Sequence, residues 1–212
     1  MRPLIIAYGG TVEPIDDVRV LTNLSRGALG RELVRVALEA GARVHALVGR
    51  FAARPDAHRR LVVEEFGAAL DLGKRLEAAL RAARGVPGLA MAAAVSDYRP
   101  RRLVRGKIPS GAGTLTLELV KNPKLVDRVR RWRPGTRVVS FKLGGDTTSE
   151  RDLLGLAAAQ RERTGSVGVV ANYYPRSGAH SAWWVDAAGV RPLRGRPAIA
   201  RAVVRALLAD AT

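Results

Sequence analysis

The residues best suited to chemistry lie near the start of the chain, in the stretch YGGTVEPIDDVRVLTNLSRGALG at positions 8–30. Its paired glycines, which end in Gly10, let a ligand approach the backbone closely, and Thr11 adds a hydroxyl group. Arg19 carries a planar fork of donors suited to phosphate or carboxylate, and Asn23 can bond a carbonyl and a donor simultaneously. These residue types indicate a site for an anionic, activated carboxyl compound.

A second hydroxyl, that of Ser25, is placed to cap the helix that follows, and the N–H groups of that helix's first turn favour an anion. The same residues also have a purely structural interpretation. Asn23 and Ser25 would then only cap the helix, and Arg19 would pair with Asp16 or Asp17. Spacing alone leaves both interpretations open.

The order of strand, glycines and helix also suggests a dinucleotide-binding unit, but three details argue against it. The spacing G-x-G-x-x-G is absent. The second strand ends in Gly49 and Arg50, without an acid for ribose hydroxyls, although Arg50 could face the extra phosphate of NADP. Tyr98 is followed four residues later by Arg102, where a short-chain reductase would have lysine. About seventeen residues separate the first strand from the first helix, and a loop of that length is typical of a functional site.

Beyond this loop, apolar runs alternate with segments of helical period, which predicts an α/β fold with a mainly parallel sheet. Strands are expected at 3–7, 43–48, 61–65, 88–98, 137–143 and 168–171. Helices are expected from Ser25, over 68–84, from Pro123, over 149–163 and over 197–211. The nearly uncharged run GLAMAAAVSDY is typical of a central buried strand, and SAWWVD and GVRPL predict a terminal antiparallel pair.

The first helix is predicted to end at Gly41 and to bury one apolar face. That face carries Leu29, Leu33, Val36, Ala37 and Ala40. Farther along, RPRRLVRGKIPSGAG at 99–113 mixes proline and glycine with five basic residues, which predicts a mobile loop. The next residues, TLTLELV, alternate strictly and predict a strand. One face of that strand would carry Leu115, Leu117 and Leu119.

The composition of the 212 residues is that of a globular protein, with 26% charged and 47% hydrophobic residues. We expect a single domain, 1–212, and no stretch approaches the length of a membrane span. The N-terminus MRPLIIAYGG is interpreted as a strand and not as a leader, which predicts a cytoplasmic protein. Because the chain has no cysteine, disulfides, thiolate nucleophiles and cysteine-bound metals are excluded.

The net charge of +17 suggests anionic partners, such as phosphorylated small molecules, nucleic acid or an anionic surface. The arginines are spread singly and in pairs, whereas a nucleic-acid arm would more often be one block. A solvated, arginine-rich surface without a specific partner explains the charge equally well.

Five motifs, in order and spanning nearly the whole chain, resemble the phosphopantothenoylcysteine synthetase (phosphopantothenate–cysteine ligase) family of coenzyme A biosynthesis. They are GGTVEPIDDVRVLTNLSRGALG, AAAVSDYRP, LELVKNPKLV, VVSFKL and VVAN. In addition, Lys107-Ile108 stands ten residues beyond Asp97, as in the family. Such an ordered set is far more specific than any single motif.

The resemblance implies a Rossmann-like three-layer fold, a homodimer, and a stand-alone ligase without flavin. In the implied reaction, the carboxylate of 4′-phosphopantothenate attacks the α-phosphate of CTP or ATP and releases pyrophosphate. The amine of L-cysteine then attacks the acyl-nucleotide and expels the monophosphate. This reaction needs no enzyme nucleophile and depends on positioning and charge stabilisation. The triphosphate implies Mg²⁺, although the sequence has no carboxylate cluster or histidine pair to hold it.

Residue by residue, the resemblance assigns catalytic roles to three side chains. Asn23 would hold the acyl-nucleotide, Arg19 would organise that loop, and Lys107 would close over the phosphates on a flexible basic flap at about 99–113. The substrate-binding set is Arg19, Asn23, Ser25 and Gly27. The nucleotide-binding set is Gly10, Thr11, Met91, Ala92, Ala93, Asp97, Lys107, Pro123, Lys124, Leu125, Val126 and Phe141. No metal ligands are assigned.

Several positions depart from the family's pattern. Arg26 stands where the family has serine, and a Lys-Ile-Lys-Lys flap is reduced to Lys107-Ile108-Pro109. Lys124 replaces an aspartate, and QRERT at 160–164 replaces lysines. Since these positions touch the nucleotide, the choice between CTP and ATP stays open. The rival hypothesis is a non-catalytic nucleotide- or nucleic-acid-binding protein on the same fold. We expect neither a membrane partner nor sequence-specific nucleic-acid binding.

Overall fold

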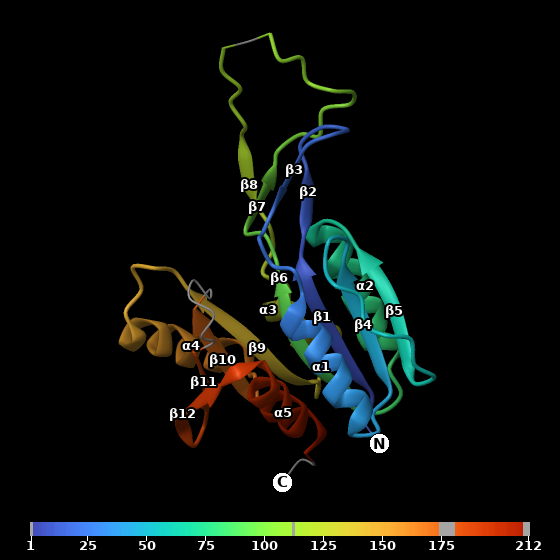
Figure 1. Ribbon diagram of the computed structural model, residues 1–212, viewed down its shortest axis with the longest axis vertical. Helices are drawn as coiled ribbons and strands as arrows, with labels where there is room; N and C mark the ends of the chain where they lie inside the picture. Colours follow the sequence, from blue (N-terminus) through green and yellow to red (C-terminus); the bar gives the residue numbers. More distant parts are fainter. Residues whose placement is uncertain (1, 112, 174–180, 210–212) are drawn as a thin grey trace.

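The computed structural model describes residues 2–111, 113–173 and 181–209, and an eight-stranded sheet forms its centre (Figure 1). The strands are β1 (Leu4–Gly10), β4 (Val44–Gly49), β5 (Leu61–Phe66), β6 (Gly88–Ala94), β9 (Arg137–Gly144), β10 (Gly168–Tyr173), β11 (Ser181–Asp186) and β12 (Gly189–Arg194). Their order is β12-β11-β10-β9-β6-β1-β4-β5. All neighbours are parallel except β10 with β11 and β11 with β12. The predicted parallel sheet, its central β6 strand and its antiparallel extension are therefore confirmed.

Helices cover both faces of this sheet in the described residues. They are α1 (Ala28–Glu39), α2 (Ala69–Ala82), α3 (Leu125–Trp132), α4 (Glu150–Thr164) and α5 (Gly195–Leu208). Side chains alternate along β1, so Ile6 and Tyr8 pack with α1 and α5, whereas Ile5 and Ala7 pack with α2 and α3. Helix α4 touches α3 and packs on β10. The result is the expected three-layer Rossmann-like fold.

The start of α1 differs from the prediction. The N-cap is Gly27, whose φ of 77° is a left-handed conformation that favours glycine, and no side chain caps this end. Ser25 is therefore not the cap, because the chain is still non-helical two residues beyond it. Gly41 follows the helix with φ 84°, which confirms the predicted end. Ala40, expected on the apolar face, is exposed.

Two antiparallel ribbons project from the sheet and form an arm (Figure 1). One pairs β2 (Val12–Pro14) with β3 (Val20–Thr22), and the other pairs β7 (Tyr98–Pro100) with β8 (Leu119–Lys121). We call residues 12–22, 98–111 and 113–121 the arm. The predicted long loop before α1 thus contains a hairpin, which periodicity did not indicate because each of its strands has only three residues.

The strand predicted over TLTLELV is wrong for most of its length. Only its last two residues belong to β8, and the ladder ends where the Arg101 N–H donates to Glu118 O at 2.8 Å. Leu115 and Leu117 are exposed, since no second layer covers their face. An alternating pattern predicts a strand only where one face is buried, and this condition fails here.

Helix α3 begins at Leu125, two residues later than expected. The reason is that Asn122 is hydrogen-bonded to the segment that follows β6. Its backbone N–H donates to Asp97 O at 2.8 Å, and its side-chain amide donates to Ser96 O at 2.9 Å. These bonds keep the chain extended through the end of β8, so helical geometry starts after Lys124. None of the helices in the described ranges is long and apolar enough to cross a membrane.

Candidate active site

The direction in which the sheet grows reverses between β1 and β6, so the carboxyl ends of these two strands form its switch point. From β1 the chain builds β4 and β5 on one side, and β6 starts the other side with β9 and β10. The helix that follows β1 lies on one face, and α3, which follows β6, lies on the other. In open α/β sheets a ligand binds at such a switch point, because the two connections diverge there.

Asn23 lies at this switch point. Its Nδ2 donates to the carbonyl oxygen of Ala94, the last residue of β6, at 2.8 Å. The hydroxyl of the preceding residue, Thr22, donates to Thr11 O at 2.7 Å. Gly10 permits this approach, because a Cβ there would lie 3.1 Å from the Asn23 carbonyl oxygen. The loop after β1 is thereby attached to the carboxyl end of β6 and to the residue that follows β1, and the exposed Asn23 lies at the switch point.

The hydroxyl group of Thr11 makes hydrogen bonds within the protein. Its Oγ1 accepts the Ser96 N–H at 2.9 Å and donates to Ser96 Oγ at 3.1 Å, and the residue is fully buried. The Thr11 hydroxyl thus fixes the turn after β6. Met91 and Leu125 are also buried, at 6% and 3% exposure.

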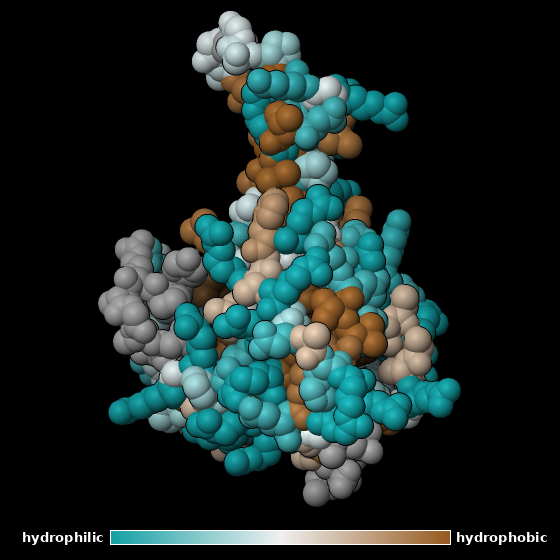
Figure 2. All heavy atoms as spheres, turned by 45° about the vertical axis from the view of Figure 1, so that its right-hand side comes forward, coloured by the Kyte–Doolittle hydropathy of each residue, from teal (hydrophilic) through white to brown (hydrophobic). Residues whose placement is uncertain are grey.

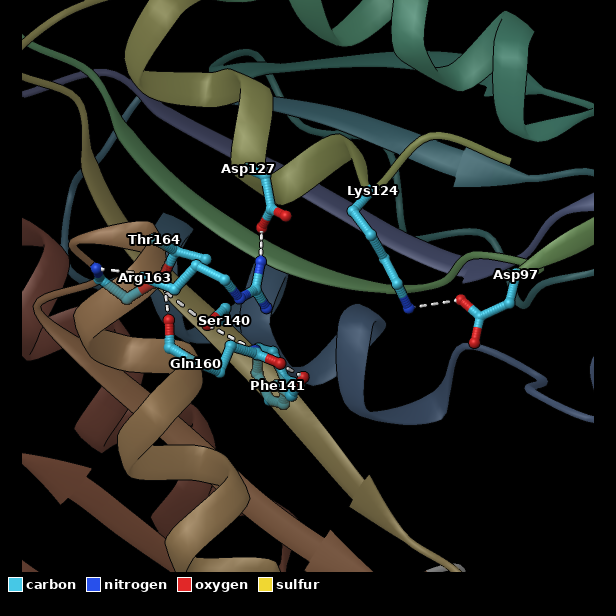
Figure 3. Close-up of polar contacts among 9 residues, drawn as sticks. Asp97, Lys124, Asp127, Ser140, Phe141, Gln160, Arg163 and Thr164 are labelled. Carbon is cyan, nitrogen blue, oxygen red and sulfur yellow. Dashed lines mark hydrogen bonds and ion pairs between the residues drawn. The ribbon is translucent and has the colours of Figure 1, made fainter. Parts of the chain in front are cut away.

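A second group of predicted residues lines the β6–β9 side, where the close-up in Figure 3 shows them. Lys124 Nζ lies 2.6 Å from Asp97 Oδ1, and both side chains are 62% exposed. Phe141 is partly buried on β9, and Gln160 Nε2 donates to its carbonyl oxygen at 3.2 Å. The remaining members of the nucleotide-binding set here are partly buried: Ala92, Ala93, Pro123 and Val126.

The 160–164 segment contacts this group through its first residue. Gln160 Nε2 also donates to Ser140 Oγ at 2.9 Å, which in turn shares a hydrogen bond with Ser166 at 3.1 Å. Arg163 pairs with Asp127 of α3. The sequence indicated only that QRERT replaces lysines; the link from Gln160 to the Phe141 carbonyl needed the tertiary structure.

The other predicted catalytic residues lie on the arm. Arg19 is in the β2–β3 turn, and Lys107 is in the long β7–β8 connection. The turn and the connection both project away from the sheet (Figure 1). Arg19 Nη1 donates to Asp16 Oδ2 at 2.8 Å, so the ion pair allowed by the structural interpretation forms. Ser25 is partly buried in the loop before α1. Within one chain, the site residues therefore form two groups, one at the switch point and one on the arm.

Asp16 has an unusual electrostatic environment. Burial alone would raise its pKa, but the N–H groups of Ile108, Val18 and Arg19, together with the Arg19 guanidinium, leave the pKa below its usual value. The carboxylate is therefore ionised at neutral pH. No group of three or more His, Cys, Asp or Glu within the described ranges could hold a metal ion.

Fold and site together define an α/β protein of the Rossmann-like class with a switch point between β1 and β6 and a basic arm. The chain belongs to the family described as "DNA/pantothenate metabolism flavoprotein C-terminal domain", whose model matches residues 1–184.

Curated relatives agree with this assignment. The chain is 34% identical over 171 residues to the "Coenzyme A biosynthesis bifunctional protein CoaBC" of Thermococcus kodakarensis, covering 81% of this chain and 41% of the relative. It is 33% identical over 167 residues to the CoaBC protein of Mycobacterium tuberculosis strain H37Rv, covering 78% and 37%. The chain thus spans about two fifths of the length of these relatives.

Solved structures share the fold. The DNA/pantothenate metabolism flavoprotein from Streptococcus pneumoniae superposes with a TM-score of 0.87 at 25% identity, over 97% of each chain. A Cab2 mutant in complex with phosphopantothenate-cysteine superposes with a TM-score of 0.81 at 20% identity, over 96% of this chain and 85% of that one. The latter likeness supports the fold.

Proposed function

We propose that the protein is a ligase that joins 4′-phosphopantothenate to L-cysteine through an acyl-nucleotide intermediate, with CTP or ATP as co-substrate. Family membership and the CoaBC relatives support this activity. The observation that carries it for this chain is the 2.8 Å bond from Asn23 to Ala94 O. It joins the first two of the five motifs that carry the resemblance at the carboxyl edge of the sheet, where a nucleotide would bind.

In this proposal the protein supplies positioning and charge. A carboxylate oxygen of phosphopantothenate bonds to the α-phosphorus while the bond to pyrophosphate breaks. The cysteine amine then bonds to the acyl carbon, the monophosphate leaves, and the amine loses a proton. Asn23 would orient the acyl phosphate, and Arg19 and Lys107 would offset the phosphate charge. The Phe141 backbone and the Asp97–Lys124 pair would meet the nucleotide.

We further propose a homodimer, because one chain leaves Arg19 and Lys107 on an arm that projects away from the sheet. The arm carries exposed apolar side chains, which Figure 2 shows along its length. They include Val18 at 65%, Leu103 at 57%, Leu115 at 53%, Val20 at 42% and Val104 at 42% exposure. Such a surface favours burial against a second copy, and the switch point of that copy would then receive the arm's cations.

Mg²⁺ would enter as part of the nucleotide substrate. The described residues provide no cluster of ligands for a resident ion, so the triphosphate oxygens would hold the metal and Mg²⁺ would neutralise their charge. We propose no flavin for this domain.

Pyrophosphate release tests the activity. Purified protein with 4′-phosphopantothenate, L-cysteine, Mg²⁺ and either CTP or ATP should form the coupled product and one pyrophosphate per product. Omission of phosphopantothenate should abolish release. No release with either nucleotide would overturn the ligase, and nucleotide binding without turnover would favour the non-catalytic rival. Comparison of CTP with ATP identifies the co-substrate.

A further inference from the structure

Two adjacent carboxylates hold the backbone on either side of Lys107. Asp16 Oδ2 accepts the Ile108 N–H at 3.0 Å, although 92 residues separate them. Asp17 Oδ2 accepts the Gly106 N–H at 3.0 Å, and the Asp17 N–H donates to Gly106 O at 3.3 Å. The Lys107 side chain is exposed. Its two neighbouring peptide groups are thus tied to the β2–β3 turn while its ammonium group stays accessible.

Asp16 is enclosed and fully used as an acceptor. Its side chain is 0% exposed, and its Oδ1 accepts the N–H groups of Val18 at 2.9 Å and Arg19 at 2.7 Å. Its Oδ2 accepts from Arg19 Nη1 at 2.8 Å as well as from Ile108. One oxygen therefore shapes the turn, and the other joins the turn to the Lys107 segment.

The same contacts orient Arg19. Its Nη1 donates both to Asp16 Oδ2 and, at 3.2 Å, to Ile108 O. Within the described part of the chain, the Nη2 and Nε edge of this guanidinium has no protein partner. That edge is the one that grips a phosphate or a carboxylate with two parallel bonds.

We propose that Asp16 is a positioning residue, assisted by Asp17, that joins Arg19 and the Lys107 segment so that both cations meet the substrate as one unit. The roles of Arg19 and Lys107 in this inference rest on the proposed ligase activity, whereas the contacts themselves do not. The physical benefit is preorganisation. A basic loop that is tied down before substrate binds loses less conformational freedom on binding.

Three variants separate this role from general stability. Asp16→Asn keeps one oxygen for the turn but puts an NH₂ group, which cannot accept, opposite Ile108 and Arg19 Nη1. Asp17→Ala removes an exposed side chain whose carboxylate bonds only to Gly106 in the described residues, so the acceptor is lost while folding is preserved. Glu118→Gln is the matched control, because it makes the same charge change in the arm at an ion pair with Arg101 2.6 Å away.

Amide hydrogen exchange measures the attachment without any activity. Exchange should quicken about tenfold or more at Ile108 in Asp16→Asn and at Gly106 in Asp17→Ala, with wild-type rates in the control. Unchanged rates at both amides would overturn the proposal. This readout stands even if the wild-type protein releases no pyrophosphate, which would remove the ligase but not the attachment.

Kinetics then tests positioning. Asp16→Asn and Asp17→Ala should lower kcat/KM for pyrophosphate release about tenfold and several-fold, respectively, with the control unchanged. Because Asp17 acts through Lys107, adding Asp17→Ala to a Lys107→Ala variant should cost nothing further. Additive losses in that pair would identify a merely structural effect and would overturn the positioning role.

Discussion

Replacement of Asn23 by alanine should separate catalysis from folding. In the folded chain the carboxamide makes one bond, from Nδ2 to Ala94 O at 2.8 Å, and the residue is exposed. Loss of one such bond costs about 0.5–1.5 kcal/mol, and for a chain of this size each kcal/mol lowers Tm by about 2–4 °C. Asn23→Ala should therefore melt within about 6 °C of the wild type.

Activity should respond far more strongly. Removal of a donor that stabilises charge in a transition state typically lowers kcat by about 10²–10³-fold, or about 3–4 kcal/mol. We expect a loss of this size in the formation of the coupled product, measured by mass spectrometry alongside pyrophosphate release. The stability cost and the catalytic cost of Asn23→Ala thus differ by about 2–3 kcal/mol on these estimates.

Thr22→Val is the matched control. It removes the neighbouring bond, from the Thr22 hydroxyl to Thr11 O at 2.7 Å, that attaches the same loop to the residue following β1. The free energy of unfolding should fall by about 1 kcal/mol, as in Asn23→Ala, while product formation stays within about threefold of the wild type. Equal catalytic losses in the two variants, or wild-type turnover in Asn23→Ala, would mean that Asn23 only tethers the loop.

Three further predictions concern packing, the nucleotide and pH. Gly30→Ala should cost about 1–3 kcal/mol or more in thermal unfolding, because its Cβ would lie 2.0 Å from Tyr8 Cγ. Gln160→Leu should raise the nucleotide KM several-fold and lower kcat less, because the amide that orients the Phe141 carbonyl is lost. Burial raises the pKa of Tyr8 from 10.0 to about 12, against the opposing effect of nearby arginines. The folded state thus holds this proton more tightly than the unfolded state, so this stabilisation is complete below pH 10 and is lost as pH rises towards 12. Denaturant titrations should show that Tyr8→Phe loses less stability than the wild type over that range, by up to about 2–3 kcal/mol.

A specific result would contradict each of these three predictions. Gly155 lies in α4 with no atom within 4 Å of an added Cβ, so Gly155→Ala should instead stabilise the protein by about 0.5–1 kcal/mol. Equal effects at positions 30 and 155 would contradict the packing argument. An unchanged nucleotide KM in Gln160→Leu would mean that the orientation of the Phe141 carbonyl does not affect nucleotide binding. If the free energy of unfolding falls equally with pH in the wild type and in Tyr8→Phe, Tyr8 does not cause the loss of stability at alkaline pH.

Local patterns predicted most of the sheet and helices because burial on one or both faces leaves a periodic trace. The uncharged β6 run predicted a central strand, and the Gly41 stop of α1 followed from glycine's access to left-handed φ. The same reasoning failed at Leu115 and Leu117, where alternation met no covering layer. It failed at Ser25 because a cap depends on where the chain turns, and Gly27 makes that turn.

The sequence by itself determined the three-layer order of elements and the residue types of the site, including the amide of Asn23 and the cations Arg19 and Lys107. Only the tertiary structure decided which of them meet. Asn23 reaches Ala94 across 71 residues, and Asp16 reaches Ile108 across 92. The physical reason is that periodicity reports which face of an element is buried, whereas a contact between distant segments depends on strand order and on the turns that project the arm.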